Sequence, residues 1–132
     1  MLKFCFIIIT SIIAFSANAQ NYNNSNTRQT ISSPDNNVNF RLFQTNNAWT
    51  FLRLDTRNGI ICHVQFSMDS NQMLYPLNDE PLAEGEDAIP GRFFLYPTEN
   101  SFNFILLDQI DGRVWQVQWN QDESKRCILQ IK

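Results

Sequence analysis

The chain has 132 residues, of which 43% are hydrophobic, 13% aromatic and 17% charged, and its formal net charge is -3. This length suits one domain and is marginal for two. The small negative charge argues against a nucleic-acid binder that relies on phosphate neutralisation, and four glycines and five prolines are too few for a collagen-like or low-complexity chain.

The first 19 residues have the layout of a secretory signal peptide. Lys3 provides a positive charge, residues 4–15 form a nearly continuous apolar run, and Ala17 and Ala19 are small residues at the positions that a signal peptidase reads. The apolar run is shorter than the roughly 20 residues that span a bilayer. We therefore expect cleavage after Ala19, a secreted or periplasmic mature chain, and no membrane span after cleavage.

Residues 20–37 form a polar segment, dominated by Asn, Ser, Thr and Gln, with Tyr22 and Ile31 as its only large apolar residues. Such a segment buries too little apolar surface to offset the entropy that ordering would cost. We expect a flexible tether here, followed by a single domain over residues 38–132.

The domain contains an internal repeat. Residues 51–66, FLRLDTRNGIICHVQF, align without gaps on residues 104–119, FILLDQIDGRVWQVQW. Further upstream, Arg41-Leu42-Phe43 aligns with Arg92-Phe93-Phe94 if two residues are gapped. Identity at a fixed offset over this length indicates a duplication. We expect two copies, at about residues 39–77 and 91–131, joined by an acidic linker over residues 78–90.

Each copy is predicted to be an antiparallel four-stranded meander. Short apolar-rich runs bounded by polar residues are typical of strands. The expected strands cover residues 41–44, 49–54, 60–66 and 73–77 in the first copy, and 92–96, 102–107, 113–119 and 127–131 in the second. One meander alone would leave an apolar face exposed, so we expect the two pseudo-symmetric meanders to pack together as a small barrel or a sandwich.

A turn motif separates the second and third strands of each copy. Asp55 and Gly59 begin and end this motif in the first copy, and Asp108 and Gly112 do so in the second. Asn-Gly or Asp-Gly between two apolar runs is a strong hairpin signal, because glycine adopts a positive φ without a Cβ clash. The leading aspartate can accept hydrogen bonds from backbone N–H groups across the turn.

The third strands alternate between two faces. We expect the buried face to hold Ile60, Cys62, Val64 and Phe66, matched by Arg113, Trp115, Val117 and Trp119 in the second copy. The opposite, wetter face would hold Ile61, His63 and Gln65, matched by Val114, Gln116 and Gln118. This alternation places His63 on the surface or half-buried.

No set of residues has the pattern of a catalytic or metal site. His63 has no nucleophile motif beside it, and glutamine takes its place in the second copy. Asp55 and Asp108 could be a pair of catalytic carboxylates, but each begins a turn. The acidic residues of the linker lack the spacing of a calcium-binding loop, and the cysteines lack zinc spacing. We therefore expect no enzyme, metal or cofactor.

Two cysteines, Cys62 and Cys127, remain after the expected signal cleavage. In an oxidising compartment they could form one disulfide. They could equally be free thiols that pack as small hydrophobic residues.

Four residues are candidates for ligand contact. Exposed aromatic side chains could hold a sugar ring, and Trp115 and Trp119 are candidates, although both fall on the face expected to be buried. Gln65 and Gln118 occupy equivalent positions, and glutamine has little strand propensity. A repeated glutamine could hydrogen-bond to a ligand or to the backbone.

The second copy resembles a known group of sequences. GRFFLYPTEN, residues 91–100, and FNFILLDQIDGRVWQVQW, residues 102–119, resemble segments of small uncharacterised secreted proteins of gut-type bacteria. In that group an Asp-x-x-x-Gly turn precedes a Trp-Gln-Val-Gln strand. The first copy departs from the pattern, with Cys62-His63 in place of Trp-Gln. The resemblance implies secretion and a β-repeat, and it carries no activity.

These features favour a non-catalytic binding or interaction module outside the cytoplasm, whose partner is an unknown glycan, peptide or envelope protein. One alternative is a structural envelope subunit that self-assembles through an exposed sheet edge. Another is a small hydrolase, in which His63, Asp55 and a hydroxyl group would have to converge in one cleft. The oligomeric state stays open at this point.

Overall fold

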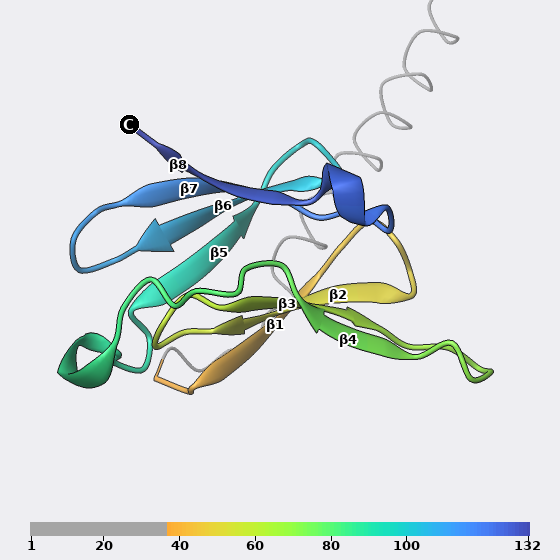
Figure 1. The fold of residues 1–132 in the computed structure, drawn as a ribbon, viewed down its shortest axis with the longest axis horizontal. Coiled ribbons are helices and arrows are strands. Elements are labelled where there is room, and N and C mark those ends of the chain that lie inside the picture. Colours follow the sequence, from red (N-terminus) through yellow and green to blue (C-terminus); the bar gives the residue numbers. More distant parts are fainter. Residues whose placement is uncertain (1–36) are drawn as a thin grey trace, which may run out of the picture. The chain divides into compact units, whose positions relative to one another are not determined.

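The structure is a computed structural model that describes residues 37–132. The expected signal peptide and nearly all of the expected tether lie outside the described residues. Within the described range, Figure 1 shows two successive groups of four strands.

The eight strands form two sheets. Sheet A contains β1 (Phe40–Gln44), β2 (Thr50–Asp55), β3 (Ile61–Gln65) and β4 (Met73–Pro76), hydrogen-bonded in that order. Sheet B contains β5 (Phe93–Pro97), β6 (Asn103–Asp108), β7 (Val114–Gln118) and β8 (Cys127–Ile131), also in chain order. Two short 3-10 helices, η1 (Gly85–Asp87) and η2 (Glu123–Lys125), precede β5 and β8.

All neighbouring strands pair antiparallel. The predicted all-β class and the two four-stranded meanders are therefore confirmed. The sheets do not close into a barrel, and they form a sandwich.

The turn between the second and third strands has the same geometry in both sheets. The carbonyl of Asp55 accepts a hydrogen bond from the N–H of Gly59, and the carbonyl of Asp108 accepts one from Gly112, both at 2.9 Å. The two glycines have φ angles of 77° and 73°, a region that favours glycine because it has no Cβ. The structure thus places all four residues in the turns.

The strand register shows how closely the copies correspond. Phe40 pairs with Asp55 in sheet A, and Phe93 pairs with Asp108 in sheet B. The first strands therefore keep the offset that relates the rest of the repeat. The two-residue gap expected between the first strands is wrong, because backbone pairing aligns β1 with β5 directly.

The two sheets bury opposite faces of the repeat. The buried residues of sheet A include Phe43, Leu52, Leu54, Ile61 and His63, and those of sheet B include Phe93, Leu95, Leu106, Trp115 and Val117. The buried face predicted for the third strand is correct in sheet B. It is wrong in sheet A, where Ile61 and His63 face the core and the exposed Phe66 lies on the other side.

The packing of the two sheets explains this reversal. Two like sheets that meet through a two-fold axis bring the same face together, whereas two sheets stacked in the same direction bring opposite faces together. The rings of His63 on β3 and Trp119 after β7 meet across the core with their centroids 5.7 Å apart, so the face of sheet A that holds His63 lies against the face of sheet B that holds Trp119. Sheet A therefore presents one face of the repeat to the core, and sheet B presents the other.

The linker between the copies also contributes to the core. Its five acidic side chains are exposed, as expected of a solvated segment. Leu82, however, packs against the core and Ala83 is buried within it. The carbonyl of Leu82 accepts a hydrogen bond from the Arg113 guanidinium at 3.1 Å, so the linker is tied to both repeats.

Candidate functional site

The carboxylate of Asp108 is fully buried and is engaged by two arginines. Arg92 donates two hydrogen bonds to it, at 3.0 and 2.9 Å, and Arg113 donates a further two, at 3.2 and 2.9 Å. Burial opposes ionisation of this group, but the arginine hydrogen bonds outweigh that effect and hold the pKa of Asp108 well below its usual range. This carboxylate is therefore fixed within the fold.

The equivalent carboxylate, Asp55, has a simpler environment. It accepts hydrogen bonds from Arg57, through the backbone N–H at 3.0 Å and through the guanidinium at 3.0 and 2.7 Å. Arg57 is partly exposed. Asp55 thus closes its own turn.

His63 is completely buried between the sheets, which corrects the surface or half-buried position expected from the sequence. Its Nδ1 lies 2.5 Å from the hydroxyl of Tyr75, and its ring meets Trp119 edge-on at 84°. Its Nε2 is buried without a hydrogen-bond partner in the structure. Burial, and secondarily the charge of Arg126, lower the pKa of His63.

His63 and Asp55 do not share a cleft. His63 lies on the face of sheet A that contacts sheet B, whereas the register places Asp55 on the opposite face, beside Phe40 of β1. The arrangement needed for a hydrolytic site between these two residues is not present.

The two tryptophans named as ligand candidates lie in the core. Trp115 and Trp119 are both buried, and the indole N–H of Trp119 donates to the carbonyl of Ser101 at 3.0 Å. Gln118 donates to the carbonyl of Lys125 at 2.8 Å. These three side chains therefore serve the packing and the loop before β8.

The disulfide considered between Cys62 and Cys127 is not formed. Both are free thiols and they lie in different sheets. The Cys62 sulfur accepts a hydrogen bond from Arg53 at 3.5 Å.

The fourth ligand candidate, Gln65, lines an open groove at one end of sheet A, and Gln121 from the loop after β7 also borders this groove. We call this feature the aromatic groove and define it by Trp49, Gln65, Phe66, Ser67 and Asp69. Its volume is about 370 Å³. The exposed rings of Trp49 and Phe66 lie 5.0 Å apart with a tilt of 48°. They form an exposed apolar surface.

Polar groups border these rings. The side-chain oxygen of Gln65 is buried without a hydrogen-bond partner in the structure. Ser67 donates a hydrogen bond to the Asp69 carboxylate, which lowers the pKa of Asp69. An aromatic surface beside amide and carboxylate groups suits a partner with both apolar and hydrogen-bonding atoms.

Sequence reasoning singled out Gln65 but assigned Phe66 to the core. The reason is visible in the second copy, where Phe102 and Trp119 stack in the same way at 5.3 Å. There Trp119 is covered by His63 of sheet A. Within residues 37–132 no further sheet lies in front of sheet A to cover Phe66, and a single sequence does not reveal that difference.

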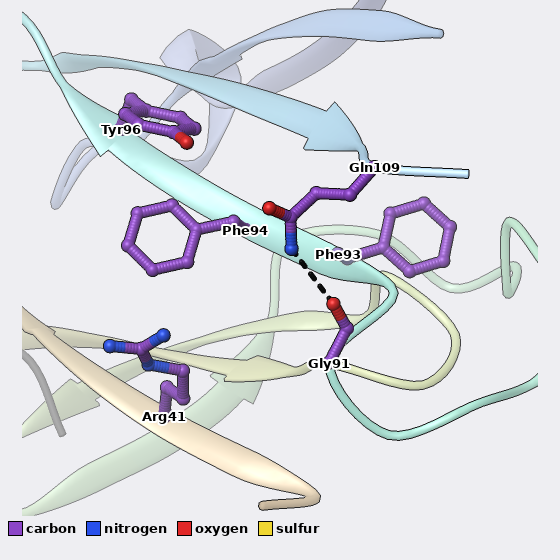
Figure 2. A pocket seen from close by; sticks show the side chains of 6 residues that line it. All are labelled: Arg41, Gly91, Phe93, Phe94, Tyr96 and Gln109. Atoms are coloured by element: carbon purple, nitrogen blue, oxygen red, sulfur yellow. Dashed lines mark hydrogen bonds between the residues drawn. The ribbon is translucent and has the colours of Figure 1, made fainter. Parts of the chain in front are cut away.

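A second, smaller cavity of about 270 Å³ lies beside β1 and β5 (Figure 2). The Arg41 guanidinium stacks over the Phe94 ring at 4.5 Å, and Gln109 donates a hydrogen bond to the carbonyl of Gly91 at 2.8 Å. Figure 2 shows the ring of Tyr96 on β5, the strand that also carries Phe94. The polar groups of this cavity are largely engaged with the fold itself.

Apolar side chains remain exposed on the outward face of each sheet. On sheet A these are Phe40, Leu42, Phe66 and Leu74. We define the outer face of sheet A as these four residues and the half-buried Phe51 and Val64. On sheet B they are Tyr96, Leu129 and Ile131. We define the outer face of sheet B as these three residues and the half-buried Ile105, Gln116 and Val114. The aromatic groove adjoins the outer face of sheet A.

Among residues 37–132, no three His, Cys, Asp or Glu side chains are grouped as metal ligands. No helix in this range is long and apolar enough to cross a membrane. Comparison with protein-family models, with curated proteins and with solved structures gave no match to the chain.

Proposed function

We propose that the protein is a non-catalytic interaction module that acts outside the cytoplasm, and that the outer face of sheet A with its aromatic groove is the contact surface. The observation that carries this proposal is the exposed pair Trp49 and Phe66, whose counterparts Phe102 and Trp119 are stacked in the same way, with Trp119 covered. Exposed aromatic rings beside other apolar residues are typical of binding surfaces.

The distribution of titratable groups supports a non-catalytic role. Asp108, Asp55 and His63 are hydrogen-bonded within the fold, to Arg92, Arg57 and Tyr75 respectively. General acid-base chemistry needs such groups next to one another and within reach of a substrate.

Export is part of the proposal, and it has a simple test. The signal-like segment predicts that the protein recovered from the envelope or the medium begins at Gln20. N-terminal sequencing of the recovered protein checks this, and an intact Met1 on all of it would contradict export by signal cleavage.

Capture from the envelope extract of the producing organism tests the contact surface. The chain as secreted is immobilised in three forms: unchanged, Trp49→Ala with Phe66→Ala, and Phe102→Ala. We expect bound partners on the first and third forms and a loss of at least tenfold on the second, since stacked aromatics dominate binding energy at such surfaces. Equal capture by all three forms would contradict the proposed surface.

A further inference from the structure

We propose that the partner of the outer face of sheet A is a second copy of this chain, which lays the outer face of its own sheet B there. This inference rests on the proposed function, because it names the occupant of the same surface. The association continues, between molecules, the stacking that already joins the two sheets within one molecule.

The internal interface shows what each face of the repeat can bind. Sheet B contacts sheet A through the face that holds Leu95, Trp115 and Trp119, and sheet A contacts sheet B through the face that holds Phe43 and His63. Because the sheets stack in the same direction, sheet A keeps outside the face that sheet B has buried. Sheet B likewise keeps outside the face that sheet A has buried.

Two positions on the outer face of sheet A carry apolar side chains where the internal interface buries apolar side chains. Leu42 is 43% exposed, whereas its counterpart Leu95 is 0% exposed in the internal interface. Phe66 is 44% exposed and its counterpart Trp119 is 2% exposed.

The outer face of sheet B follows the same rule. Tyr96 is 45% exposed, whereas its counterpart Phe43 is 4% exposed. Each outer face therefore carries apolar side chains where the internal interface buries similar ones, and each is complementary to the other in kind.

This complementarity is of the head-to-tail type. The part of the chain that the structure describes offers one uncovered face of each kind, so every added copy leaves one such face of each kind until a ring closes. In β-propellers about 4–8 four-stranded sheets stack around an axis, so about two to four copies of a two-sheet chain would close such a ring.

Other occupants make different demands on the chain. A sugar or peptide held by Trp49 and Phe66 would not need the outer face of sheet B. Edge-to-edge pairing would use the backbone of an edge strand and would leave both faces free. The experiment therefore has to change the two faces separately.

Sedimentation velocity of the secreted chain over a wide concentration range tests the proposal. We expect the unchanged chain to associate, and Leu42→Glu and Tyr96→Glu to sediment as monomers where the unchanged chain is assembled. Mixed in equal amounts, the two variants are expected to form a dimer and nothing larger, because each retains the face that the other lacks. Ile110→Glu removes from a turn an apolar side chain that is more exposed than Leu42 or Tyr96, and this variant is expected to assemble normally.

A second pair of substitutions guards against misfolding. Leu74→Glu on sheet A and Leu129→Glu on sheet B change the most exposed leucine of each outer face. We expect each of these variants to sediment as a monomer and their equal mixture to form a dimer. Near-UV circular dichroism, to which the buried Trp115 and Trp119 contribute, shows whether each variant keeps its fold.

Three outcomes would overturn the proposal. They are a monomeric unchanged chain at all concentrations, self-association of either single-face variant alone, and no dimer in the mixture of folded variants. If the chain stays monomeric but still captures a partner through Trp49 and Phe66, the second copy is overturned and the interaction module stands. If capture also fails, both are overturned.

Discussion

At the scale of single residues, the two equivalent turn aspartates show how environment separates identical side chains. Asp108 is buried and accepts hydrogen bonds from Arg92 and Arg113, and Arg92 is itself buried. Asp55 relies on the partly exposed Arg57. The same residue in the same turn therefore holds a buried ion network in one copy and a local pair in the other.

Asp108→Asn is expected to destabilise the fold strongly. The substitution removes the buried carboxylate and leaves Arg92 with the exposed Asp111 carboxylate, at 2.8 Å, as its ionic partner. Removing one partner of a buried ion pair costs about 3–5 kcal/mol. The free energy of unfolding in urea measures the effect. Asp55→Asn is the matched control and should cost clearly less, and equal losses in the two variants would contradict the difference described here.

His63 predicts a dependence of stability on pH. Its pKa is lowered in the folded protein by burial and by Arg126, so the unfolded chain takes up a proton near pH 6.5 and the folded chain does not. The free energy of unfolding should therefore fall as the pH drops below about 6.5. Urea unfolding between about pH 5 and pH 8 measures this slope.

His63→Gln is the test variant, because glutamine stands at the equivalent position, Gln116, in sheet B. We expect the variant to be less stable at neutral pH, since the contact with Tyr75 changes, and to lose most of the slope between about pH 5 and 6.5. A variant that keeps the full slope would show that another group is responsible.

At the scale of elements, the turn glycines differ in what surrounds them. A Cβ at Gly59 would lie 3.0 Å from a methyl carbon of Leu82 and 3.3 Å from the Phe93 ring, whereas a Cβ at Gly112 would meet nothing within 4 Å. Both have positive φ angles. The hairpin of sheet A is thus packed under the linker, and that of sheet B is open.

Gly112→Ala should cost about 1–2 kcal/mol from the positive φ alone. Gly59→Ala should cost more, because the added methyl group also presses on Leu82 and Phe93. Thermal unfolding of the two variants side by side measures the difference. If Gly112→Ala proves the more damaging, the described packing of the first hairpin is wrong.

The sequence was sufficient to predict the strands, the hairpins and the repeat because these depend on local chemistry. An aspartate and a glycine at the ends of a turn, and alternation along a strand, act through neighbouring atoms. The buried face was predicted correctly for Trp115 and wrongly for His63. Both faces of the first copy carry apolar residues, and the choice between them depends on the direction in which the sheets stack.

The candidate site was only partly accessible to the same reasoning. Gln65 was singled out because it repeats, but Phe66 was assigned to the core because its counterpart is a tryptophan on an apolar face. The exposure of Phe66 comes from the absence of a sheet in front of sheet A among the described residues. Such a feature belongs to the arrangement of elements and leaves no local mark in the sequence.

At the scale of the whole molecule, the proposed self-association depends on same-direction stacking of two like sheets. That arrangement leaves two different outer faces, and each resembles a face that the core already buries. Within one molecule, His63 of sheet A contacts Trp119 of sheet B. Gln116 is equivalent to His63 and Phe66 is equivalent to Trp119. The same contact between two copies would therefore join Gln116 of one molecule to Phe66 of the next.

Cross-linking between introduced cysteines shows which faces of two copies meet. Cys62→Ser and Cys127→Ser remove the native thiols, and Phe66→Cys and Gln116→Cys are then introduced into separate chains. With a short bis-maleimide, we expect a covalent 1:1 dimer from the mixture and none from either chain alone. Cross-linking of either chain to itself, or a yield from the mixture no higher than that with Ile110→Cys in place of Gln116→Cys, would contradict the proposed self-association.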